Sequence, residues 1–101
     1  MSSNVGKKII EGKREKYFIY DRIIMNYMDK IMNIIKEINE LTEKKRKYIL
    51  SEYIEKDTKL KRDIRKECRA LNFQIRELET KLDFLEEQYD YYNGLMEDFL
   101  E

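Results

Sequence analysis

The chain has 101 residues, which bounds it to one small domain. It has one cysteine and no histidine, which excludes an intramolecular disulfide and every catalytic or zinc site that depends on an imidazole. Its 21 Lys and Arg balance its 21 Asp and Glu, and charged residues make up 42% of the chain against about 25% in an average globular domain, which favours an elongated helical protein.

The first twelve residues are polar and basic and include Gly6 and Gly12. We expect a flexible basic lead over residues 1–12, followed by a single helical domain over residues 13–101. This lead lacks the apolar run of a signal peptide, and no stretch of the chain approaches the ~20 apolar residues of a membrane helix. With a single cysteine, the chain is expected to be cytoplasmic, in a reducing compartment and without a membrane partner. The excess of Ile and Lys over Ala and Val indicates an AT-rich genome.

Between Lys13 and Asn93 the chain has neither proline nor glycine. Apolar residues recur there at alternating intervals of three and four, which is the pattern of helices packed in a coiled coil. The first of two such series, here called the first seam, predicts a helix over about residues 13–54. It consists of Tyr17, Tyr20, Ile24, Tyr27, Ile31, Ile34, Ile38 and Leu41.

The second seam predicts a helix over about residues 58–100. It consists of Ile64, Cys68, Leu71, Ile75, Leu78, Leu82, Leu85, Tyr89, Tyr92, Met96 and Phe99. The two seams are out of phase by two residues, which neither a single stutter nor a single stammer produces. We therefore expect a turn within residues 42–60, with the best local break at Glu55-Lys56-Asp57-Thr58, where Asp57 or Thr58 would cap the second helix.

Two architectures are consistent with these seams. An eleven-residue rhythm from Ile38 to Leu82 allows one continuous helix in a parallel coiled coil. The charge distribution favours the other, a long antiparallel helical hairpin, because residues 1–76 hold 20 Lys and Arg against 12 Asp and Glu, whereas residues 77–101 hold one lysine and nine acids. A turn near residue 57 would place residue i opposite residue 114 − i, with Tyr17 and Tyr20 meeting Met96 and Phe99.

The first predicted helix carries a second apolar face, about 100° around the helix from the first seam. We call it the apolar stripe, and it consists of Phe18, Met25, Met28, Met32 and Ile35. A weaker set lies on the second helix, at Phe84, Tyr91 and Leu95. A hairpin leaves the apolar stripe uncovered, so we expect it to be a protein interface. Its partner is then a second copy, giving a homodimeric four-helix bundle, or another protein.

The sequence offers little chemistry for catalysis. It contains neither GxGxxG nor GxxxxGK[ST], so no phosphate-binding loop is expected, and no acidic group has the spacing of a calcium loop. Cys68 falls on the second seam, where a small buried apolar residue is more common than a reactive thiol. We expect no catalytic residue, no cofactor, no metal and no small-molecule substrate, and hence no enzymatic activity.

Residues 43–69 form a basic segment with a net charge of +5, in which Tyr48 and Tyr53 lie among the cations. Such a segment attracts phosphate backbones, and its aromatic rings can stack on unpaired bases, although basic helices are more often only solvated. The residues that would contact nucleic acid are Lys44, Lys45, Arg46, Lys47, Lys59, Lys61, Arg62, Arg65, Lys66 and Arg69.

These features favour a non-enzymatic protein–protein interaction module: a small adaptor, regulator or inhibitor that acts through helix–helix packing. The alternative is a nucleic-acid-associated protein that uses the basic tip of the hairpin.

Overall fold

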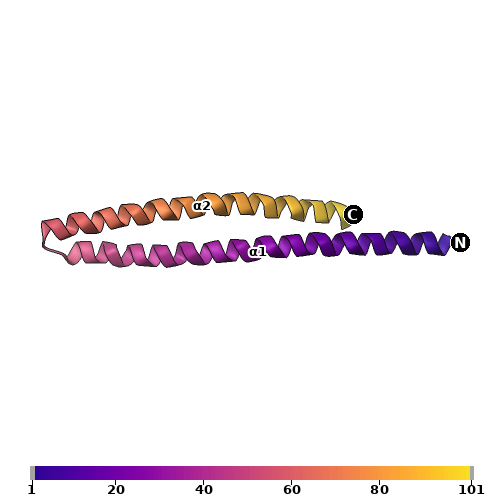
Figure 1. Cartoon of the computed structure of the whole chain (residues 1–101), viewed down its shortest axis with the longest axis horizontal. Coiled ribbons are helices and arrows are strands. Elements are labelled where there is room, and N and C mark those ends of the chain that lie inside the picture. The colour runs from indigo at the N-terminus through magenta and orange to yellow at the C-terminus, as the bar shows by residue number, and fades with distance from the viewer. Residues whose placement is uncertain (1, 101) are drawn as a thin grey trace. The chain divides into compact units, whose positions relative to one another are not determined.

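The computed structural model describes the backbone of residues 2–100 and the side chains of residues 12–100. It contains two α-helices, α1 (Ser2–Ile54) and α2 (Thr58–Leu100), which pack against each other in opposite directions (Figure 1). No strand occurs in the part of the chain that is described. The all-α helical hairpin is thereby confirmed, and the continuous helix is wrong.

Helix α1 begins earlier than the sequence suggested, at Ser2 rather than near Lys13. The predicted start near Lys13 is corrected, while the flexibility of residues 1–12 stays a prediction. The two glycines each cost about 1 kcal/mol relative to alanine, but the segment has no proline, so the helix continues through it. The basic lead contains Lys7 and Lys8, whose side chains lie outside the described residues.

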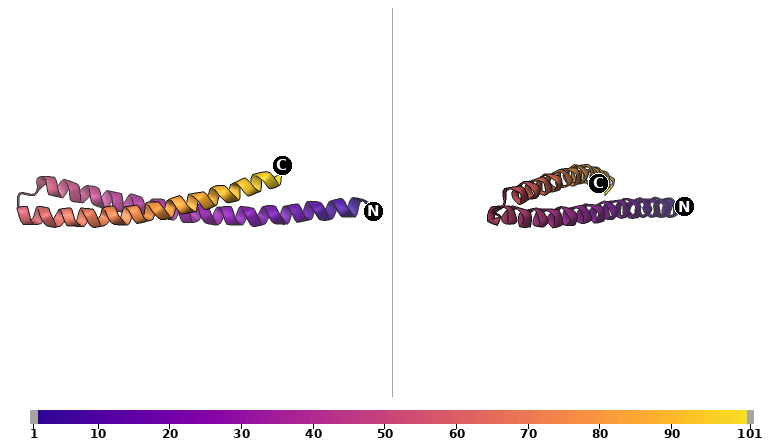
Figure 2. Two further views of the ribbon diagram at one scale, coloured as in Figure 1. Left: turned by 90° about the horizontal axis from the view of Figure 1, so that it is seen from above. Right: turned by 60° about the vertical axis from the view of Figure 1, so that its left-hand side comes forward.

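The turn between the two helices consists of residues 55–57 (Figure 2). Side-chain oxygens of Glu55 and Asp57 stabilise it. Asp57 is the N-cap of α2, because its Oδ1 accepts a hydrogen bond of 2.9 Å from the backbone N–H of Lys59. Glu55 Oε1 accepts from the backbone N–H groups of Lys56 and Asp57, each at 3.1 Å. Asp57 rather than Thr58 therefore supplies the capping oxygen, and no glycine is needed to end α1.

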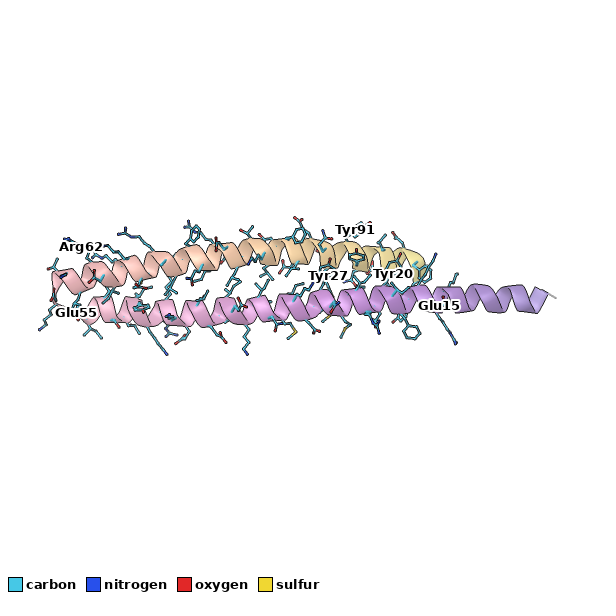
Figure 3. The ribbon with its side chains drawn as sticks, viewed as in Figure 1. Glu15, Tyr20, Tyr27, Glu55, Arg62 and Tyr91 are labelled. Carbon is cyan, nitrogen blue, oxygen red and sulfur yellow. The ribbon has the colours of Figure 1, made fainter. Side chains whose placement is uncertain are left out.

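The chain divides into two compact units, and the first comprises Met1–Lys30 and Leu85–Glu101. In this unit Ile24 is buried between the two helices, with 5% of its surface exposed. Aromatic side chains form the neighbouring layers: the Tyr20 and Phe99 rings lie 6.2 Å apart edge to face, and the Tyr27 and Tyr92 rings lie 5.7 Å apart and stacked. Tyr20 and Tyr27 point from α1 toward α2, whereas Tyr91 points outward (Figure 3).

The second unit, Ile31–Phe84, contains the turn and the helical segments on either side of it. Leu71 of α2 is its most buried residue, at 4% exposure, and the other seam residues of this unit are half-buried. Nearer the turn, the alternating spacing of three and four residues continues along α1, but polar or amphipathic residues occupy these positions. These residues are also half-buried. They are Lys45, Tyr48, Glu52 and Glu55. Long polar side chains can cover apolar neighbours with their stems while their charged ends reach water, so the packing extends to the turn.

The predicted meeting of Tyr20 with Phe99 is confirmed, but the register between the helices differs from the predicted one. In the first unit residue i lies opposite residue 119 − i, as Tyr20 with Phe99 and Tyr27 with Tyr92 show, rather than opposite residue 114 − i. In the second unit, residues 55–57 run outward past the end of α1, so that α2 begins beyond that end (Figure 1).

Candidate protein interface

The apolar stripe begins in the first unit, where α2 leaves it uncovered. Phe18 is 66% exposed, Met25 is 50% exposed and Met28 is 37% exposed, whereas Ile24 beside them is 5% exposed. The difference follows from helix geometry, because Ile24 belongs to the seam and the stripe lies around the helix from it. Phe18 also borders a hollow of about 580 Å³ on α1, together with Ile19, Asp21, Arg22 and Ile23.

In the second unit the remaining stripe residues are exposed as well. Met32 is 64% exposed and Ile35 is 40% exposed. Both line a hollow of about 570 Å³ on the surface of α1. Its other lining residues are polar: Lys36, Asn39, Glu40, Glu43, Lys44 and Lys47. In each unit, therefore, the predicted interface residues lie on the surface of α1 and remain in contact with water.

Another exposed apolar surface of the first unit lies where α2 ends beside α1. Leu100 is 61% exposed there, and a hollow of about 390 Å³ is lined by Lys13, Arg14, Tyr17, Phe18, Phe99 and Leu100. The Nζ of Lys16 lies 6.0 Å from the centre of the Phe99 ring, which is a favourable contact between a cation and an aromatic face. Sequence reasoning missed Leu100 and the 57%-exposed Ile19, because it followed seams of regular spacing and neither residue continues one.

On α2 the weaker apolar set is only partly exposed. Phe84 in the second unit and Tyr91 in the first unit are each 60% exposed, whereas Leu95 in the first unit is half-buried. The Tyr91 ring packs edge to face on its neighbour Tyr92 at 5.3 Å. These residues therefore do not form a stripe comparable with that of α1.

The basic segment lies around the turn in the second unit, and most of its cations are exposed. Lys45 and Lys61 are half-buried, and the others are open to solvent: Lys44, Arg46, Lys47, Lys59, Arg62, Arg65, Lys66 and Arg69. Arg65 Nε donates to Glu52 Oε1 in an ion pair, the one ion pair recorded among the side chains of residues 12–100. Tyr53 is 89% exposed beside these cations.

Other chemistry is sparse in the described part of the chain. Within residues whose side chains are placed, no cluster of three or more His, Cys, Asp or Glu side chains is arranged to hold a metal ion. Cys68 is a free, half-buried thiol on the second seam, at the spacing that places Ile64 and Leu71 on the same helix face. Neither described helix combines the length and the apolar character needed to cross a membrane.

A scan against protein-family models gives no match, and neither do searches of curated proteins and of solved structures. Inference about function therefore rests on the surfaces described above.

Proposed function

We propose that this chain is a non-enzymatic, cytoplasmic protein–protein interaction module, a small adaptor, regulator or inhibitor that acts by helix–helix packing. The observation that carries the proposal is the exposure of Phe18, Met25 and Met28 in the first unit and of Met32 and Ile35 in the second. These side chains lie on helix α1, on surfaces that α2 does not cover.

Energetics favour covering these residues. Full burial of a side chain of this size is worth ~1.5–3 kcal/mol, and these five side chains still expose between 37% and 66% of their surface. A partner helix would therefore gain roughly 1 kcal/mol from each. Methionine suits such a contact because its flexible thioether adapts to irregular surfaces.

Site-specific photo-crosslinking in cells of the source organism tests this proposal. A photoreactive residue at position 28 should form a discrete crosslinked product, because Met28 lies within the proposed interface. The matched control is position 73, since Phe73 is 63% exposed on α2 and lies outside the stripe. Met32→Asp should remove the product formed at position 28. Equal crosslinking at positions 28 and 73 would show that the stripe is ordinary surface.

A second candidate, nucleic-acid association, has one specific observation in its favour. Three acids near the turn already have partners within the chain. Glu52 pairs with Arg65, while Glu55 and Asp57 accept hydrogen bonds from backbone N–H groups. These three carboxylates are engaged in this way, while most cations of the segment and Tyr53 are exposed to solvent. Phosphates would meet such a surface without sequence preference.

Gel-shift titrations with single-stranded DNA and RNA at two salt concentrations test the second candidate. We expect binding at ~50 mM salt that weakens steeply at ~200 mM, because bound phosphates release counterions. Changing Arg46, Arg62 and Arg69 together to Glu should abolish it, and all three side chains are exposed, so the helices should remain intact. Absence of a shift at ~50 mM salt would eliminate this candidate.

A further inference from the structure

We infer that the partner of the apolar stripe is a second copy of this chain, bound with its α1 helix antiparallel to the first. The inference deepens the proposed function and rests on it. Its evidence is a row of charges beside the stripe, which is self-complementary in one orientation only.

The charged row lies roughly 40° around α1 from Phe18, Met25 and Met32, because Arg22, Asp29 and Lys36 follow these residues by four positions at ~100° per residue. It repeats every seven residues with alternating sign: Glu15, Arg22, Asp29 and Lys36. All four side chains are exposed. No ion pair recorded among residues 12–100 involves any of them.

Reversing the chain direction places Arg22 and Asp29 of this row opposite each other within the first unit. With two α1 helices antiparallel and centred between Met25 and Met28, residue i of one copy lies opposite residue 53 − i of the other along the stripe. Met25 then packs on Met28 of the second copy, and both residues belong to the first unit. Along the charged row, residue i of one copy lies opposite residue 51 − i of the other. The reason is that residues at the same heptad position beside the core face each other in antiparallel coiled coils.

The flank therefore pairs Arg22 with Asp29 of the second copy. In a parallel pair the charged row would instead face the opposite flank of the second copy, where the seam residues Ile24 and Ile31 lie, and neither Arg22 nor Asp29 would meet an opposite charge. Each exposed pair is weak, so the row selects orientation and register, while the apolar stripe supplies most of the affinity.

The exposed stripe residues of the first unit provide the apolar area for this contact. Phe18, Met25 and Met28 keep 66%, 50% and 37% of their surface exposed, and a second copy can cover part of each. Because few side chains take part, we expect a reversible dimer.

Charge reversal tests the register. Each dimer contains two contacts between position 22 of one copy and position 29 of the other. In the Arg22→Asp variant both contacts join two acids, and in the Asp29→Arg variant both join two bases. Each variant should therefore weaken self-association about tenfold or more. A mixture of the two single variants should restore it, because every contact between positions 22 and 29 of the mixed dimer then joins an acid to a base. The double variant Arg22→Asp/Asp29→Arg should also restore it. Glu87→Arg, at an exposed position on α2, is the matched control and should leave association unchanged.

Sedimentation equilibrium of the full chain measures these effects, with circular dichroism reporting helix content for each variant. A monomer has a mass of 12.5 kDa, and the wild type should approach twice that mass at micromolar concentration. A wild type that stays monomeric overturns the inference. So does a dimer that neither single reversal weakens, or one that mixing fails to restore.

These failures are distinguishable from failure of the proposed function. If the wild type is monomeric but position 28 crosslinks to a different protein, the stripe is still an interface and only its identification with a second copy is wrong. If position 28 forms no specific product and the wild type is monomeric, both proposals fail.

Discussion

Tyr27 of α1 and Tyr92 of α2 stack against each other in the first unit, with ring centroids 5.7 Å apart and planes inclined by 23°. The next aromatic layer, Tyr20 with Phe99, is edge to face. Both layers join seam residues that lie far apart in the sequence. Aromatic contacts thus take the place of the Leu and Ile layers found elsewhere on the two seams.

We expect Tyr92→Ala to lower the free energy of unfolding by about 1.5–3 kcal/mol, because the half-buried ring loses apolar contact area and its stacking partner. Urea unfolding at one fixed protein concentration measures this change. In a double-mutant cycle with Tyr27→Ala the coupling energy should be about 0.5–1.5 kcal/mol. Purely additive effects would show that the rings do not interact.

Leu71 and Phe73 allow a direct contrast between seam and surface. Leu71 is 4% exposed and Phe73 is 63% exposed, two positions apart on α2. Leu71→Ala should cost about 2–5 kcal/mol of unfolding free energy, because it leaves a cavity between the helices. Phe73→Ala should cost at most about 1 kcal/mol, since little of its surface is removed from water. A similar loss of unfolding free energy at the two positions would contradict the structure, in which Leu71 lies on the face of α2 that packs against α1 and Phe73 lies on an exposed face.

Among the turn residues, substitution of Asp57 should lower the free energy of unfolding most. Asp57→Ala removes the oxygen that accepts from the backbone N–H of Lys59, and we expect a loss of about 1 kcal/mol in urea unfolding. Asp57→Asn retains an acceptor and should have a smaller effect, while Thr58→Ala should be nearly neutral. A larger loss for Thr58→Ala than for Asp57→Ala would identify Thr58 as the cap.

The architecture was accessible from the sequence because the two seams are unusually regular. Eight and eleven consecutive positions fix which face of each helix is buried, and the sorting of charge along the chain favours antiparallel packing. The register was not accessible. It depends on where α2 starts relative to the end of α1, and that depends on the path of residues 55–57, which hydrophobic periodicity does not encode.

The helix start near Lys13 was mispredicted for a similar reason. Gly6 and Gly12 lower local helix propensity, but propensity is a weak guide in a segment that continues a long helix. The apolar stripe could be recognised in the sequence because its spacing is helical and distinct from the seam, and its role as an interface stays a prediction. Its exposure required the structure, since the position of α2 decides which apolar face of α1 is covered.

Gly94 is the position at which a single substitution should stabilise the hairpin. It lies inside α2, its φ is not positive, and an added Cβ would meet nothing within 4 Å. Alanine there restricts the unfolded chain without strain in the folded one, so Gly94→Ala should raise the free energy of unfolding by about 0.5–1 kcal/mol. In a domain of this size the thermal midpoint should rise by about 3–6 °C. Glu87→Ala, an exposed change on the same helix, is the control and should shift the free energy by less than about 0.5 kcal/mol. Destabilisation by Gly94→Ala would mean that a surface outside this hairpin approaches α2 at Gly94, which would place a protein contact on α2 rather than on the apolar stripe of α1.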